Sequence, residues 1–118
     1  MTHTEIVKKF FQVALDIHHN HLNTTLYSEH IALKEAYQAF DEFKDTVAES
    51  LIAFEGPIDK LEFDEVGLCK TLDLPDDMME AASMLKEYAA KKNYPDLVNF
   101  SDEVYATGVK LKYLLRLT

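Results

Sequence analysis

Apolar residues recur at three- and four-residue steps along most of this chain, which is the period of an amphipathic α-helix. No stretch alternates between apolar and polar residues in the way that predicts a strand. The steps predict helices over residues 4–21, 28–54 and 76–92, and a last helix from Pro95 to the end of the chain. We therefore expect an all-α fold, an up-down four-helix bundle that forms a single domain over residues 1–118.

Capping residues support these boundaries. Thr2 and Glu5 have the spacing of a capping box, and Gly56 with the following proline stops the second helix. Asn93 closes the third helix, and Pro95 suits the first turn of the fourth. Between the second and third helices the pattern weakens. We expect a long crossover connection there, in which residues 59–65 have the potential to form a short helix.

The apolar stripes predict which residues face the core. In the first, third and fourth helices the inward positions are Ile6, Phe10, Val13, Ala14, Ile17, Met78, Ala81, Ala82, Leu85, Tyr88, Ala89, Leu97, Val98, Val104, Tyr105, Gly108, Leu111 and Leu115. The second helix has a much wider apolar side, made by Ile31, Leu33, Ala36, Tyr37, Phe40, Phe43, Val47, Leu51 and Ile52. Such width predicts a subunit interface in addition to a core contact.

Composition narrows the range of partners. The 118 residues carry 21 acidic and 12 basic side chains, a net charge of −9, which disfavours a phosphate backbone and favours cations or basic partners. No apolar run approaches the roughly 20 residues needed to cross a bilayer. The single Cys69 has no partner for an internal disulfide, and the first residues lack the pattern of a secretion signal. We therefore expect a cytoplasmic protein without a membrane anchor.

Four residues of the first two helices have side chains suited to metal binding: His18, His30, Asp45 and Glu49. Neutral imidazole with carboxylate is a ligand set that suits iron, zinc or manganese. Asp45 and Glu49 are one helical turn apart, so their side chains leave the same face of the helix.

These residues also have plainer interpretations. The histidines near the end of the first helix, His18, His19 and His21, complement the negative end of the helix dipole. Asp45 and Glu49 are then solvated acids, and His30 is a core or interface histidine.

Several segments resemble the Dps branch of the ferritin-like proteins. They are His18-His19-Asn20-His21, Tyr27-Ser28-Glu29-His30, Tyr37 and Asp45-Thr46-Val47-Ala48-Glu49. The signature of that family is a His near the end of the first helix, a second His 12 positions later, and an Asp-x-x-x-Glu further along the second helix. In this chain the steps from His18 to His30, Asp45 and Glu49 are 12, 15 and 4 residues. The resemblance covers about residues 10–57 and, more weakly, the last helix.

The resemblance implies a ferroxidase-type site between two subunits, used for iron sequestration and protection against oxidative stress. In such a site His18 and His30 come from one chain and Asp45 and Glu49 from its two-fold partner, with His19, His21 and Lys34 as auxiliary candidates. The metal is iron, with zinc or manganese as alternatives. The division fits the spacing, because 19 residues of straight helix separate the backbones of His30 and Glu49 by about 28 Å. Two-fold dimers, assembled further into a dodecameric shell, are the expected homo-oligomers.

The chain departs from the family pattern at Lys34, where an aspartate is usual one turn after the second histidine. An ammonium beside a cation site is unfavourable, so ferroxidase-like activity requires that Lys34 leave the metal site intact. The alternative is a non-catalytic oligomeric scaffold of the same fold, a viral or accessory protein. Its dimer clefts bind a protein partner or a small anionic, nucleotide-like ligand near Lys34 and the histidines. Direct DNA binding is disfavoured, because the basic N-terminal tail of DNA-binding members is absent.

Overall fold

The computed structural model describes all residues, 1–118, and contains four long helices and no strand. The helices are α1 (His3–Asn23), α2 (Tyr27–Glu55), α3 (Leu74–Lys92) and α4 (Pro95–Arg116), with a short 3-10 helix, η1 (Thr71–Asp73), before α3. All four predicted helices are confirmed, and their predicted ends differ from the observed ends by at most two residues. None of the helices combines the length and the apolar character that a bilayer crossing requires.

The helix ends follow the local sequence. Thr2 caps α1 by accepting a hydrogen bond from the Glu5 backbone N–H at 3.2 Å, as predicted. Gly56 ends α2 with φ of 90°, and Asn93 ends α3 in the left-handed conformation with φ of 61°. Pro95 opens α4 in its first turn, where no backbone N–H is needed.

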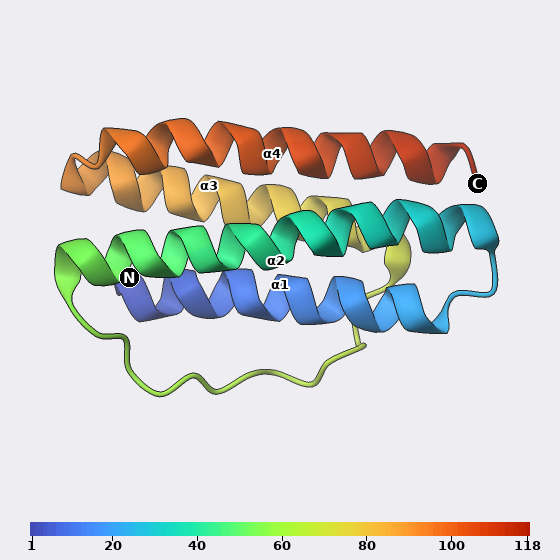
Figure 1. Ribbon diagram of the computed structural model, residues 1–118, viewed down its shortest axis with the longest axis horizontal. Coiled ribbons are helices and arrows are strands. Elements are labelled where there is room, and N and C mark those ends of the chain that lie inside the picture. The colour runs from blue at the N-terminus through green and yellow to red at the C-terminus, as the bar shows by residue number, and fades with distance from the viewer.

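Residues 56–73 connect α2 to α3 along the outside of the bundle. The connection returns along the length of α1, so α3 runs in the same direction as α2 while α1 and α4 run the opposite way (Figure 1). The predicted long crossover is therefore present. The short helix predicted over residues 59–65 does not form, and these residues are in no regular secondary structure.

The crossover stays extended because it is anchored to α1 at widely spaced points. The backbone N–H groups of Asp59 and Asp64 donate to the side chains of Thr4 and Gln12 at 3.0 and 2.9 Å. The two anchors on α1, Thr4 and Gln12, are eight residues apart, which is about 12 Å along the helix. The five residues from Asp59 to Asp64 must cover the same distance, so each must advance by about 2.4 Å. An α-helix rises by about 1.5 Å per residue and would fall short.

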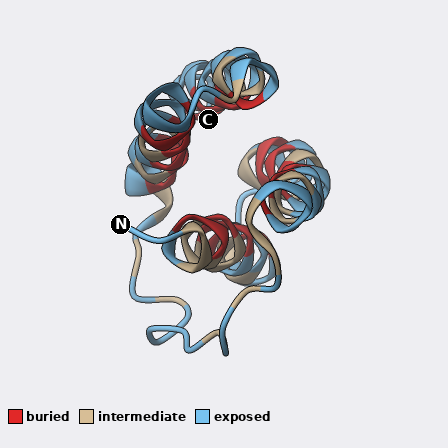
Figure 2. Ribbon diagram, turned by 90° about the vertical axis from the view of Figure 1, so that its left-hand side faces the viewer, coloured by how far each residue is buried: buried red, intermediate tan, exposed pale blue.

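One cluster of 24 buried apolar residues fills the space enclosed by the four helices. The end-on view shows the buried sides of all four helices turned toward the centre, with the crossover outside α1 (Figure 2). One predicted inward position, Tyr105, is instead exposed. Tyr105 lies next to the buried stripe of α4, one residue after Val104, and so points about 100° away from it. Ile31 and Ile52 are exposed at the edges of the wide apolar side of α2, for which the sequence also predicts a subunit interface.

Candidate metal-binding face

Four aromatic rings meet where the end of α1 lies beside the start of α2. The His21 and His30 rings stack with centroids 3.8 Å apart, and the His18 ring stacks on Tyr37 at 4.3 Å. The His21 ring also lies 6.1 Å from His18 and 4.9 Å from Tyr37. We call these four residues the histidine cluster. The predicted ligands His18 and His30 are thus close together, but the ring that contacts His30 is that of His21.

His21 and His30 are joined by two reciprocal hydrogen bonds. The His21 Nδ1 lies 3.0 Å from the His30 carbonyl oxygen, and the His30 Nδ1 lies 2.9 Å from the His21 carbonyl oxygen. A carbonyl oxygen only accepts hydrogen bonds, so both Nδ1 atoms must carry the proton and donate. In the neutral form of each ring the Nε2 is then the unprotonated nitrogen. Sequence reasoning gave His21 only an auxiliary role and missed this pairing.

The histidine cluster favours neutral imidazole at its centre. His21 is only 6% exposed, and burial lowers its pKa below the ordinary value. The hydrogen bond to the His30 carbonyl acts in the opposite direction, and repulsion by Lys34 and by the protonated forms of His30 and His18 lowers this pKa further. Neutral imidazole is the form of histidine that binds a metal.

His19 lies away from this cluster, against the crossover. Its ring fills the space beside Gly67, where a Cβ would come within 2.5 Å of the His19 Nε2. The Asn23 side-chain nitrogen is 3.3 Å from the same Nε2. His19 is therefore a packing partner of the crossover, and the structure does not bring it to the other predicted ligands.

The two predicted acidic ligands, Asp45 and Glu49, are exposed further along α2. Asp45 pairs with Lys44 at 3.5 Å, and no ion pair of α2 includes Glu49 or Lys34. Helix geometry separates the backbones of Asp45 and Glu49 from that of His30 by about 22 and 28 Å. No group of three or more His, Cys, Asp or Glu side chains in the chain is arranged to hold a metal ion. One chain does not assemble the four predicted ligands.

The predicted ligands of α2 nevertheless share one face of the helix. At about 100° per residue, the positions of His30, Lys34, Tyr37, Asp45 and Glu49 fall within an arc of about 120°. Lys34, Asp45 and Glu49 are all exposed on this arc. The stacking of His18 on Tyr37 brings the arc next to the exposed edge of α1. We call this combined surface of α1 and α2 the ligand face.

An apolar stripe on α1 lies beside His18. Phe11, Leu15 and Leu22 are spaced with His18 at three- and four-residue steps, outside the core stripe. Leu15 and Leu22 are 38% and 68% exposed. Phe11 is half-buried, stacked on Phe63 of the crossover, and has the Lys44 ammonium 4.8 Å from its ring centroid. The ligand face therefore combines exposed apolar side chains with charged ones, a mixture common in subunit interfaces.

A ladder of polar α1 residues holds the crossover on the neighbouring side of α1. Thr4, Gln12, Asp16 and Asn20 contact successive crossover residues, with the buried Asp16 accepting a hydrogen bond from the Gly67 N–H at 3.2 Å. Sequence reasoning missed these residues. The four-residue spacing of polar groups on one helix side was the available signal.

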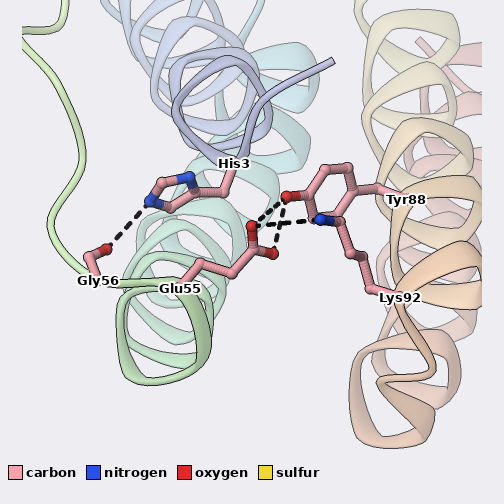
Figure 3. Close-up of polar contacts among 5 residues, drawn as sticks. All are labelled: His3, Glu55, Gly56, Tyr88 and Lys92. Carbon is pink, nitrogen blue, oxygen red and sulfur yellow. Dashed lines mark hydrogen bonds and ion pairs between the residues drawn. The ribbon is translucent and has the colours of Figure 1, made fainter.

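A second polar cluster closes the opposite end of the bundle (Figure 3). The Tyr88 hydroxyl donates to the Glu55 carboxylate, and the Lys92 ammonium lies 3.8 Å from the same carboxylate. The nearby His3 Nε2 is 3.0 Å from the Gly56 carbonyl oxygen. Burial, and then the hydrogen bond to Glu55, raise the pKa of Tyr88. Each polar group here has a partner within the chain, so this cluster acts as a clasp between α2 and α3.

Residues 21–115 match a family of unknown function (DUF5856), and the chain belongs to this family. The matched range includes His21, His30, Asp45 and Glu49, and it begins after His18. No curated protein matches the sequence, and no solved structure matches it.

Proposed function

We propose that the protein binds Fe(II) between two copies of the chain and oxidises it, as a Dps-like iron-sequestering protein. His18 and His30 of one copy and Asp45 and Glu49 of its two-fold partner form each site. The observation that carries this proposal is the ligand face: it has histidines at one end and exposed carboxylates at the other, with about 22–28 Å between them on one helix. An antiparallel copy brings the opposite ends together twice, which gives two equivalent sites per dimer.

Three further features support the proposal. Four helices with one long crossover are the topology of ferritin-like bundles. Exposed Leu15 and Leu22 beside His18 supply apolar surface for a dimer contact. A net charge of −9 attracts cations and makes an acidic face costly to bury without them.

The chemistry needs little from the protein beyond geometry. Neutral imidazole and carboxylate suit Fe(II). Each Fe(II) gives up one electron, so peroxide oxidises two Fe(II) to two Fe(III) and is itself reduced to two hydroxide ions. The carboxylates favour the more highly charged Fe(III) product, and oxidised iron accumulates within a closed oligomer.

Titration of Fe(II) into the metal-free protein without oxygen tests this function. We expect saturation at one Fe(II) per chain, particles with the mass of a dimer or of a multiple of it, and accelerated oxidation when peroxide is added. The double variant Asp45→Asn/Glu49→Gln should lose at least about tenfold in affinity. The control Asp96→Asn/Glu103→Gln removes the same charge from exposed acids of α4 and should bind as the wild type does. Wild-type protein without saturable binding or accelerated oxidation would remove the proposal.

Lys34 favours a second candidate function. Its ammonium is exposed one turn after His30 and has no carboxylate partner in the chain. In this alternative the same dimer is a non-catalytic scaffold, and the clefts around Lys34 and the histidine cluster bind an anionic, nucleotide-like ligand or another protein. The variant Lys34→Asp discriminates between the two. Metal binding that appears only in this variant supports the scaffold, and an unchanged metal affinity counts against it.

A further inference from the structure

The reciprocal contact between His21 and His30 has no equivalent among the other side chains of the ligand face. Both rings donate through Nδ1 to the backbone carbonyl of the other residue, at 3.0 and 2.9 Å, and the rings stack at 3.8 Å. The two residues are nine apart in sequence and come from different helices. Each imidazole is thus fixed in position, in ring orientation and in the nitrogen that carries the proton.

The His21 carbonyl is available to accept the hydrogen bond from His30 because α1 ends close to it. α1 ends at Asn23, so the His21 carbonyl is among the last four of the helix and has no N–H partner one turn further on. The His30 Nδ1–H satisfies it. The His30 carbonyl lies within α2, and a carbonyl oxygen has a second lone pair for the His21 Nδ1–H.

The turn between the helices keeps the two residues in register. The Thr24 hydroxyl donates to the Glu29 carboxylate at 2.7 Å and accepts from the Leu26 N–H at 3.2 Å. His21 is buried, whereas His30 is half-buried and reaches the ligand face. His21 is therefore the inner residue of the pair and His30 the outer one.

We propose that His21 is a positioning residue for His30. Its backbone carbonyl accepts the His30 Nδ1–H, and its side chain, by donating to the His30 carbonyl, holds the two residues in register. The His30 imidazole is thereby locked in the Nδ1–H tautomer and presents Nε2 as the unprotonated donor atom. Metal-binding histidines commonly hold their second nitrogen in this way, by donating it to a carbonyl or carboxylate. The role in iron binding rests on the proposed function, whereas the tautomer lock is a property of the chain itself. His21 acts through His30 and need not touch the metal.

Nitrogen-15 NMR of the histidine rings tests the lock directly, because it distinguishes a protonated ring nitrogen from an unprotonated one. In the metal-free wild type, measured at a pH at which the His30 ring is neutral, we expect His30 to have a protonated Nδ1 and an unprotonated Nε2. His21→Phe keeps a stacking ring and the backbone acceptor but loses the side-chain donor that holds the two residues in register. We expect His30 in this variant to populate both tautomers. His21→Asn retains a side-chain N–H near the position of Nδ1 and should restore the wild-type tautomer. His3→Gln, at the other end of the bundle, should leave the His30 signals unchanged.

Fe(II) affinity measured on the same variants connects the lock to the metal. We expect a loss of about tenfold in His21→Phe and recovery in His21→Asn, the usual effect of removing an orienting partner. A neutral wild-type His30 that carries its proton on Nε2 instead of Nδ1 overturns the inference whatever the iron result. A His21→Phe variant that keeps both the Nδ1–H tautomer and the wild-type Fe(II) affinity also overturns it. If His21→Phe does not fold, two results still decide against the inference: the Nε2–H tautomer in the wild type, or loss of the Nδ1–H tautomer in His21→Asn. A confirmed tautomer in a wild type that binds no Fe(II) supports the lock and removes the proposed function.

Discussion

The Tyr88 hydroxyl lies 2.6 and 2.7 Å from the two carboxylate oxygens of Glu55, and it links α3 to the last residue of α2. Tyr88 is 7% exposed and the Glu55 side chain is 17% exposed, so water competes weakly for this bond. A hydrogen bond to a charged group in such surroundings stabilises by about 1–3 kcal/mol.

We expect Tyr88→Phe to lower the free energy of unfolding by about 1–2 kcal/mol, because the substitution removes the donor and leaves the half-buried carboxylate with one partner fewer. Urea unfolding followed by circular dichroism measures the change. Tyr105→Phe removes a hydroxyl from a tyrosine that is 47% exposed, and it should change stability by less than about 0.5 kcal/mol. If the two substitutions change the free energy of unfolding equally, the Tyr88–Glu55 hydrogen bond adds no stability beyond that of an exposed tyrosine hydroxyl.

The contribution of Tyr88 should depend on pH. Burial and the Glu55 hydrogen bond raise the pKa of Tyr88 in the folded state above its ordinary value of 10.0. The folded protein therefore holds this proton more tightly than the unfolded chain does, and the resulting stability is complete below pH 10 and is lost as the pH rises above it. The stability difference between the wild type and Tyr88→Phe should narrow above pH 10. A constant or widening difference would contradict the raised pKa.

Asp16 should control how firmly the crossover is held on α1. Asp16→Ala removes the acceptor of the Gly67 N–H and should lower the free energy of unfolding by about 1–3 kcal/mol. Trypsin should then cleave faster after Lys60 and Lys70, the basic residues of the crossover. Asp59→Ala is the control, since only the backbone of Asp59 is used in the contact with Thr4. Identical cleavage rates in the two variants would contradict the anchoring role of Asp16.

Cys69 should react slowly in the native protein. Burial and the hydrogen bond to Asp77 raise the pKa of this thiol from 9.0 to about 12. At pH 8 its thiolate fraction is therefore roughly 1,000-fold lower than that of a thiol with the ordinary pKa. Alkylation by iodoacetamide should be slower than in urea-unfolded protein by a factor of this order, and Asp77→Asn should accelerate it. A native rate equal to that of the unfolded chain would contradict the account of this thiol.

The sequence was sufficient for the helices because their signals are local. Apolar residues at helical spacing predicted all four helices, and Thr2, Gly56, Asn93 and Pro95 marked ends that the structure confirms. The crossover conformation was not predictable in this way. Residues 59–65 have an ordinary helical composition, and they stay extended because Thr4 and Gln12, more than 50 residues away in sequence, take up their backbone N–H groups.

The site was predictable only in part. His18 and His30, which the sequence predicts as ligands, lie in one cluster at one end of the α1–α2 pair. The pairing of His30 with His21 depends on which carbonyls are left free where α1 ends, and ligand spacing does not contain that information. Whether Asp45 and Glu49 complete a metal site depends on a second copy of the chain, and it stays a prediction.

Complementation between two defective chains tests the shared site most directly. His18→Ala/His30→Ala and Asp45→Ala/Glu49→Ala should each bind no Fe(II) at the site. When equal amounts are unfolded, mixed and refolded together, about half of the dimers contain one chain of each kind, and each such dimer has one site with all four ligands. We predict that the mixture recovers about one quarter of the wild-type Fe(II) capacity. A mixture that forms mixed dimers and still binds no Fe(II) would contradict a site built from the histidines of one chain and the carboxylates of its partner.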